Sequence, residues 1–308
     1  MTNNDELSAM PAAINRERAR AAFAAYVEPY DAADPRIALK VDHTLRVAEL
    51  CARIAEASGF TPAGIDLVWL CGLLHDIGRF EQVRRWGTFN DRRSAPHAAL
   101  GVDVLFEGAS HLTDPAFTAN PAASECVLAE DDAFRAHARA HGFIRAFCDD
   151  PALDDLIRAA VAHHSEHHLP EGLDLRTRAF CDLVRDADKI DILHLLAIDT
   201  VENVMGISAD ELLSSIISPS ADEAFFSHRT MSWAEQHTPA DGLINRACFA
   251  YELVYPASLE IADEAGDLYL AFERPYGITE AFHDPATRFT LNRMDGHLRA
   301  WVDERLSA

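Results

Sequence analysis

The 308-residue chain contains only two lysines, Lys40 and Lys189, and its other 25 basic residues are arginines. Acidic residues number 50, so the formal net charge is −23 at pH 7. Such a balance disfavours binding to nucleic-acid polymers or to a membrane, because both require a basic surface. We expect a small molecule as the partner, and the oligomeric state stays open, with a homodimer among the alternatives.

Clustered cysteine and long apolar runs are also lacking. The six cysteines form no Cys-x-x-Cys pair, and we interpret Cys51, Cys71 and Cys181, which lie in apolar helical patterns, as reduced core residues. No charge-free apolar run approaches the roughly 20 residues that span a bilayer. The N-terminal residues do not resemble a secretory signal. These absences together predict a cytoplasmic protein.

Alternating strand patterns are scarce, with one candidate strand at 267–273, and most apolar spacing is helical. The fold class predicted is all-α. The helices expected are 16–28, 36–58, 62–77, 94–107, 151–165, 175–198, 209–217, 222–236, 241–264 and 286–306. In the helix 62–77, Gly78 is the expected stop, and Ser94 and Pro96 are the expected start of the next one. The polar residues 79–94 are predicted to form a loop.

Residues 108–150 are irregular and predict an insertion with short helices, either a lid or a solvated excursion. No internal repeat and no strong domain boundary is found. We expect residues 1–200 to form one helical domain and residues 201–308 a helical extension packed on it.

Histidine is abundant, with 15 residues, and several stand beside aspartate on helices that look buried. Isolated charges there would cost several kcal/mol each, and a metal cation would offset that cost. Imidazole and carboxylate together suit Fe, Mn, Co or Zn, whereas the scattered cysteines disfavour a thiolate site. Asp76 offers two oxygens and could bridge two metals. The candidates, in chain order, are His43, His75, Asp76, His97, His163, His164 and Asp188.

This ordered set resembles the HD superfamily of metal-dependent phosphohydrolases. The strings "KVDHT" (40–44), "HDIGR" (75–79) and "RDADKID" (185–191) are similar to its motifs, and the resemblance covers about residues 20–200. It implies an HD-domain helical bundle, here with additional C-terminal helices.

The extra histidines resemble the HDIG-type, binuclear branch, which implies two divalent transition metal ions. One metal would take His43, His75, Asp76 and Asp188; the other would share Asp76 and take His97, His163 and His164. The string "HHSEHHLPEGL" (163–173) departs from the cyclic-di-GMP branch, and "HDIGRFE" departs from the (p)ppGpp hydrolases. His167 and His168 are expected at the rim or surface.

The resemblance implies hydrolysis of a phosphate ester of a nucleotide or small phosphorylated metabolite by a metal-activated hydroxide. Residues 79–93 carry five arginines and two acids, a patch that would attract an anion. Asp76 and Arg79 are the predicted catalytic residues. Arg79, Lys189 and Arg92 are the predicted substrate-binding residues, with Lys40 a weaker candidate and a salt bridge the alternative for Lys189. Asp91, Asp186 and Asp191 are candidates for orienting a histidine.

Two other functions stay open. A few relatives of this fold use the same ligands to hold two irons in an oxygenase. A non-catalytic module that binds metal or nucleotide for regulation is the third alternative.

Overall fold

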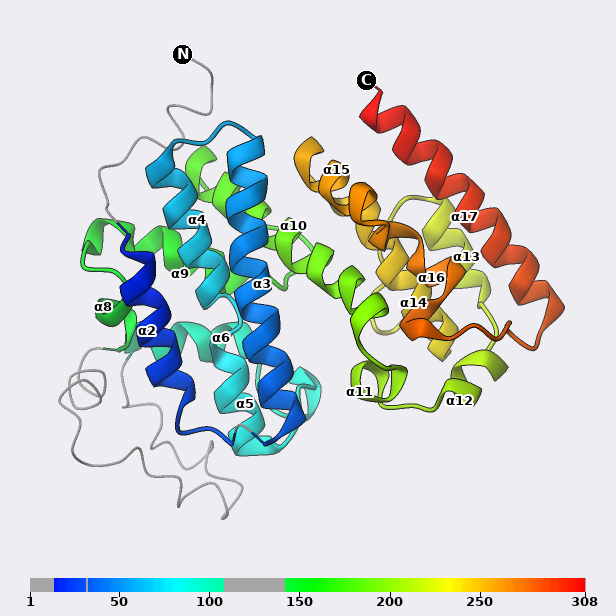
Figure 1. Cartoon of the computed structure of the whole chain (residues 1–308), viewed down its shortest axis with the longest axis horizontal. Coiled ribbons are helices and arrows are strands. Elements are labelled where there is room, and N and C mark those ends of the chain that lie inside the picture. The colour runs from blue at the N-terminus through cyan, green and yellow to red at the C-terminus, as the bar shows by residue number, and fades with distance from the viewer. Residues whose placement is uncertain (1–13, 32, 108–141, 308) are drawn as a thin grey trace. The chain divides into compact units, whose positions relative to one another are not determined.

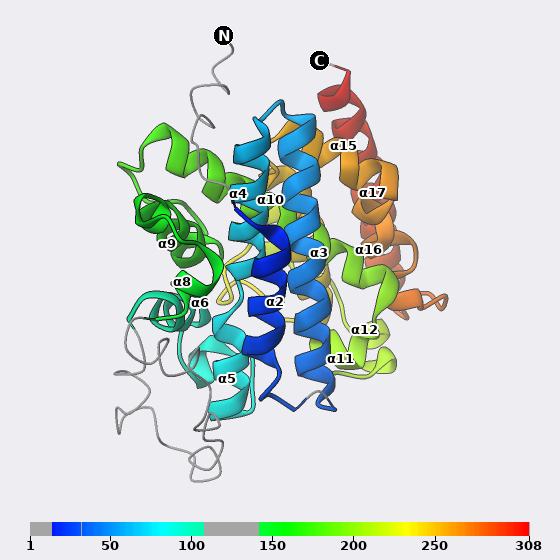
Figure 2. The same ribbon diagram turned by 60° about the vertical axis from the view of Figure 1, so that its left-hand side comes forward.

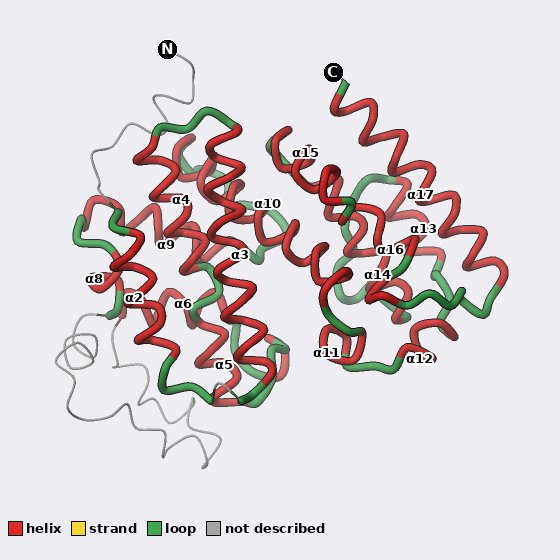
Figure 3. Tube along the Cα trace, in the orientation of Figure 1, coloured by secondary structure: helices red, strands yellow, loops and turns green. Residues whose placement is uncertain are grey.

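The computed structural model describes residues 14–31, 33–107 and 142–307, and these residues form helices and loops without a strand (Figure 3). The all-α prediction is confirmed. The strand expected at 267–273 is wrong, because a 3₁₀ turn, Asp267–Tyr269, and helix α16, Leu270–Glu273, occupy that stretch. Most of the expected insertion at 108–150 lies outside the described residues.

The chain divides into two compact units, Met1–Ala187 and Asp188–Ala308. The division falls inside helix α10, Leu175–Ile198, whose bounds match the predicted ones. The division expected at residue 200 and the packing of residues 201–308 on the first domain stay predictions.

Helices α2, α3 and α4 lie side by side in the first unit (Figures 1 and 2). Asp34 and Thr61 accept hydrogen bonds from the first turns of α3 and α4, each of which begins with a proline, as is typical of helix starts. Buried Trp69 and Leu70 of α4 belong to the core. The α-helices of this unit that precede α10 are α2 Arg16–Val27, α3 Pro35–Ala57, α4 Pro62–Leu74, α5 Gly78–Trp86, α6 His97–Val102, α8 Ile144–Phe147 and α9 Asp154–His163.

The loop predicted at 79–94 is wrong over its first half, because α5 is a helix there. Phe80 is fully buried in it, and Glu81, also buried, pairs with Arg84 and Arg85 at 2.6 and 2.8 Å. Tyr30 donates a further hydrogen bond of 2.5 Å to Glu81. The arginines that suggested a solvated loop therefore neutralise a buried carboxylate one helical turn away.

Gly78 was expected to end the helix predicted at 62–77. Helix α4 instead ends at Leu74, and Gly78 is the first residue of α5. A Cβ at Gly78 would lie 2.2 Å from the carbonyl oxygen of His97 and 2.4 Å from the nitrogen of Gly101. Helix α6 begins at His97 and not at Ser94, whose hydroxyl instead bonds the carbonyl of Asn90 at 2.9 Å. The glycine thus allows α5 and α6 to touch, which brings His97 close to residues 75–77.

The helices of the second unit are shorter than predicted, except for the last. The helix expected at 241–264 is interrupted: one helix ends at Ala247, a 3₁₀ turn occupies Cys248–Glu252, and Pro256 begins the next helix. The helix expected at 222–236 ends at Phe226. After α10 come α11 Val201–Met205, α12 Ala209–Ser214, α13 Pro219–Phe226, α14 Pro239–Ala247, α15 Pro256–Ala265, α16 and α17 Pro285–Leu306.

The core cysteines and the absence of a long apolar helix were both predicted from the sequence. Cys51, Cys71 and Cys181 are free and buried, as expected. Within residues 14–31, 33–107 and 142–307, no helix has the length and apolar character needed to cross a membrane.

Candidate metal centre

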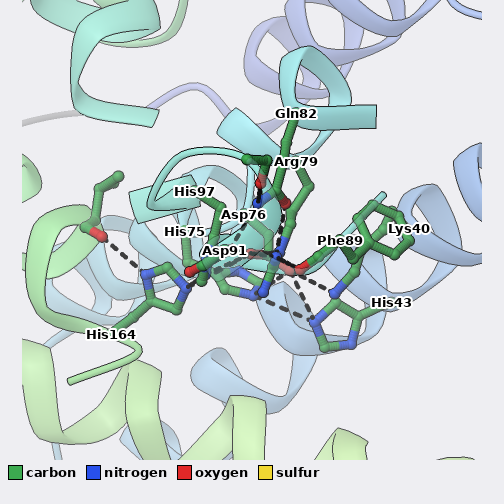
Figure 4. A network of polar contacts seen from close by, with 12 residues as sticks. Lys40, His43, His75, Asp76, Arg79, Gln82, Phe89, Asp91, His97 and His164 are labelled. Atoms are coloured by element: carbon green, nitrogen blue, oxygen red, sulfur yellow. Dashed lines mark hydrogen bonds and ion pairs between the residues drawn. The ribbon is translucent and has the colours of Figure 1, made fainter. Parts of the chain in front are cut away.

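Asp76 lies at the centre of a buried cluster of imidazole and basic side chains (Figure 4). It stands in the turn between α4 and α5, and its side chain is 4 % exposed. Lys40, on α3, donates a 2.6 Å hydrogen bond from Nζ to Asp76 Oδ2. Burial disfavours the charged carboxylate, but electrostatic attraction from Lys40, His75 and Arg79 outweighs it and holds the pKa of Asp76 well below its usual range. Asp76 is therefore an anion at neutral pH.

Two histidines face Oδ2 of Asp76. The Nε2 atoms of His43 and His75 lie 3.5 and 3.7 Å from that oxygen, and 3.3 Å from each other. His43 comes from α3, one turn after Lys40, and His75 follows the last residue of α4. His75 Nδ1 donates to the carbonyl of Gly72 at 2.7 Å, which leaves the lone pair on Nε2.

Two other histidines face Oδ1 of Asp76. The Nε2 atoms of His97, on α6, and His164, just after α9, lie 3.4 and 3.5 Å from that oxygen. His97 Nδ1 contacts Asp91 Oδ2 at 2.7 Å, and His164 Nδ1 contacts the carbonyl of Val161 at 2.8 Å. A carboxylate and a carbonyl only accept hydrogen bonds, so both Nδ1 atoms donate, and in the neutral rings both Nε2 atoms carry a lone pair.

When both rings are neutral, these two lone pairs face each other. The Nε2 atoms of His97 and His164 are 2.9 Å apart. Burial lowers the pKa of His97 to about 4, although its hydrogen bond to Asp91 opposes this, so the ring is neutral at pH 7. Beside them, Asp76 Oδ1 is buried and has no hydrogen-bond partner among the described residues. One divalent cation would satisfy both nitrogens and this oxygen, so the residues fit a metal.

The predicted ligands form three sets whose ligand atoms lie within 4.8 Å of one another in the described part of the chain: His43, His75 and Asp76; Asp76, His97 and His164; and His75, His164 and Asp188. Asp188 is carried by the continuous helix α10. His163 belongs to none of these sets, and its Nδ1 lies 3.1 Å from Glu166 Oε1. Adjacent residues on a helix point about 100° apart, which explains why only His164 faces Asp76. A ligand role for His163 stays a prediction.

Arg185 of α10 supports the end of α9 that carries His164. Its guanidinium donates to the carbonyls of His163, Glu166 and His167, at 3.3 Å to His163 and 3.2 Å to His167. A cation at these C-terminal carbonyls is favourable because they have no partner within the helix. The side chains of His167 and His168 are exposed, as expected.

Two cations and a phenylalanine ring flank Asp76 on the side of α5 (Figure 4). Phe89 lies 5.6 Å from Lys40 Nζ and 5.6 Å from Arg79 Cζ, measured to the ring centre. Arg79 Nε lies 3.4 Å from Asp76 Oδ1, while its Nη1 donates to Gln82, Phe89 and Asp91. Lys40, the weaker candidate for substrate binding, thus lies beside the candidate ligands. The hydrogen bonds of Arg79 go to Gln82, Asp91 and the carbonyl of Phe89.

The roles of the other predicted residues stay predictions. Lys189 Nζ pairs with Glu252 at 3.1 Å, the alternative considered for it, and Arg92 is exposed. Asp186 and Asp191 are buried. Gln82 and Phe89 were missed because residues 79–94 were expected to be a loop; with a helix recognised at α5, the three-residue spacing of Arg79 and Gln82 would have paired them.

Comparison with known proteins identifies the family of this region. The HD domain family model matches residues 41–112, which include His43, His75, Asp76 and His97. No curated protein and no solved structure gives a significant match. The cluster of histidine and aspartate provides ligands that could bind a metal, in keeping with a superfamily of metal-dependent hydrolases. Residues 41–112 therefore match the HD domain family.

Proposed function

We propose that this protein is a metal-dependent phosphohydrolase that cleaves a phosphate ester of a nucleotide or small phosphorylated metabolite. One observation carries the proposal. The Nε2 atoms of His97 and His164 face each other at 2.9 Å beside Asp76 Oδ1, which is buried and accepts no hydrogen bond from the described residues. A site that gathers lone pairs without a hydrogen between them is suited to a cation.

The two oxygens of Asp76 support two cation positions. His43 and His75 would hold a cation at Oδ2, and His97 and His164 one at Oδ1. Asp188 offers an oxygen within 4.8 Å of His75 and His164 and could complete either shell. Fe, Mn, Co or Zn would suit these nitrogen and oxygen ligands. When bound, such ions supply Lewis-acid activation of a phosphoryl group and of a water molecule.

The side chains of this chain would bind and orient the phosphoryl group. Lys40 uses one of its three N–H donors on Asp76 and makes no other hydrogen bond with the described residues, so two donors can face an anion. Arg79 adds a second positive charge, and its three acceptors hold the guanidinium in place. Positive groups fixed before the substrate arrives stabilise charge that develops on phosphoryl oxygens.

The net charge supports a small substrate. At −23 the chain repels polyanions. Lys40 and Arg79 provide positive charge locally, beside Asp76. We therefore favour a single phosphorylated metabolite or nucleotide over a polymer.

Metal analysis followed by a phosphate-release screen tests the proposal. The purified protein should contain transition metal and release phosphate from at least one ester in a panel of nucleotides and phosphorylated metabolites. Asp76→Ala should lose both metal and activity. Asp149→Ala, at a carboxylate that is 77 % exposed and pairs with Arg18, is the matched control and should keep both.

Two outcomes would overturn the proposal. Wild-type protein that binds no divalent transition metal would remove its basis. Iron-dependent consumption of dioxygen without phosphate release would assign the same ligands to an oxygenase.

A further inference from the structure

Gln82 is a fully buried amide whose orientation is fixed by its neighbours. Its Nε2 lies 2.7 Å from Asp91 Oδ1, 2.9 Å from Ser94 Oγ and 3.0 Å from the carbonyl oxygen of Ala95. Its Oε1 accepts a 2.7 Å hydrogen bond from Arg79 Nη1. A guanidinium only donates and a carbonyl only accepts. Reversing the amide would therefore break the hydrogen bond from Arg79 and the one to the Ala95 carbonyl.

The two carboxylate oxygens of Asp91 accept hydrogen bonds from different partners. Oδ1 accepts from Gln82 Nε2 at 2.7 Å and from Arg79 Nη1 at 3.0 Å. Oδ2 is left to accept from His97 Nδ1 at 2.7 Å. The carboxylate is thereby locked in one orientation, with an acceptor aimed at the imidazole.

We propose that Arg79, Gln82 and Asp91 form a positioning network that fixes the tautomer of His97 and so governs binding of one of the two cations. With hydrogen on Nδ1, His97 presents its Nε2 lone pair to Asp76 Oδ1 and to His164. This inference rests on the proposed function. It makes Gln82 and Asp91 positioning residues that act through His97.

The two cation positions are supported differently. His75 on the Oδ2 side and His164 on the Oδ1 side are oriented by backbone carbonyls of their own chain segments, Gly72 and Val161. His97 depends instead on a side chain, Asp91, which is 38 % exposed. A change at Asp91 should therefore weaken the position between His97 and His164 and leave the position between His43 and His75 unchanged.

Replacing Asp91 by asparagine exchanges one of its two acceptor oxygens for an NH₂ donor. If the new amide keeps its oxygen toward Arg79 and Gln82, its NH₂ group faces His97 Nδ1. Nδ1 must then accept, and the hydrogen moves to Nε2, which no longer has a lone pair for a metal. If the amide turns round, its NH₂ group faces two donors, which is costly because those donors are largely buried.

The tautomer can be measured before any metal is added. Long-range 1H–15N spectra of histidine-labelled, metal-free protein should show hydrogen on Nδ1 of His97 in the wild type and on Nε2 in Asp91→Asn. Metal titration should then give two bound cations for the wild type. In Asp91→Asn one of them should bind about 10–100-fold more weakly, as is typical when the group orienting a ligand is changed.

A second variant and a control complete the test. Gln82→Met removes the amide but keeps a side chain of similar volume, and should weaken the same cation by a smaller factor. Asp149→Asn is the control and should bind both cations as the wild type does. The inference is overturned if His97 keeps its hydrogen on Nδ1 in Asp91→Asn, or if both cations weaken equally. Failure of the wild type to bind two cations would instead count against the proposed function.

Discussion

A single carboxylate sets the electrostatics of the metal centre. Asp76 has four imidazole nitrogens within 3.7 Å and an ammonium at 2.6 Å. The ammonium and any divalent cation must share this one negative charge. Lys40 therefore acts in two opposite senses: it keeps Asp76 ionised and it opposes metal binding.

Replacing Lys40 separates these two effects. In Lys40→Met we expect divalent cations to bind about tenfold more tightly, which corresponds to about 1.4 kcal/mol of repulsion removed. Phosphate release should fall, because the variant lacks a positive charge for the phosphoryl group. Isothermal titration with zinc or manganese and a steady-state assay measure the two quantities.

A matched control for this prediction is Arg20→Met, which removes a half-exposed cation paired with Glu49. It should leave metal affinity unchanged. If cations bind Lys40→Met more weakly than the wild type, Lys40 orders the ligands and does not compete with the metal.

Among the helices, α5 carries a buried ion cluster that helps to attach it to the first unit. Burial disfavours the charged form of Glu81, but hydrogen bonds and charges from Arg84 and Arg85 outweigh it, and the pKa of Glu81 lies below its ordinary value of 4.5. Tyr30, which follows α2, donates to the same carboxylate. The position of α5, and of Arg79 and Gln82 on it, depends on this cluster.

The cluster predicts a pH-dependent stability. A lowered folded-state pKa means that ionised Glu81 stabilises the fold above about pH 4.5, and that this stabilisation is lost as the pH falls through the folded-state value. At neutral pH, Glu81→Gln should lower the free energy of unfolding by about 3–5 kcal/mol, because Arg85 stays buried without its partner. Urea unfolding at several pH values should show this difference shrinking in acid; a constant difference would exclude Glu81 as its source.

The contact between α5 and α6 offers a second prediction for these elements. Gly78→Ala should lower the free energy of unfolding by about 1–3 kcal/mol through overpacking against His97 and Gly101. It should also weaken metal binding, because α6 carries His97. Gly296→Ala, in α17, is the control: a Cβ there meets nothing within 4 Å, and alanine should stabilise the helix by about 0.5–1 kcal/mol. Thermal unfolding and metal titration of both variants give the comparison.

Across the whole molecule, the fold brings together most of the histidines and aspartates singled out from the sequence, whereas some of the helices that position them were not predicted. The predicted starts of α3, α4 and α17, at residues 36, 62 and 286, lie within one residue of the observed starts, and the bounds of α10 matched. Helix α5 was missed because the burial of Glu81 between arginines depends on tertiary contacts. The orientation of Asp91 could not be predicted either, because it is determined by hydrogen bonds from the side chains of Gln82 and Arg79.

Metal should stabilise the two units unequally. A ligand that binds the folded state at about 1,000 times its Kd stabilises that state by about 4 kcal/mol. Hydrogen–deuterium exchange should therefore slow in peptides from α3 to α6 and α9 when metal is added, with little change in α13 to α17. A chelator should reverse the effect, and equal protection of both groups of helices would contradict a centre confined to the HD domain and its neighbours.

The scarcity of lysine has a practical consequence for chemical labelling. The side chains of Lys40 and Lys189 are 17 % and 12 % exposed, and each nitrogen is engaged by a carboxylate. Acylating reagents that target side-chain amines will therefore find few sites on this arginine-rich protein. The rate at which Lys40 is acylated would report how often the segment around Asp76 opens to solvent, on a background almost free of other modified side chains.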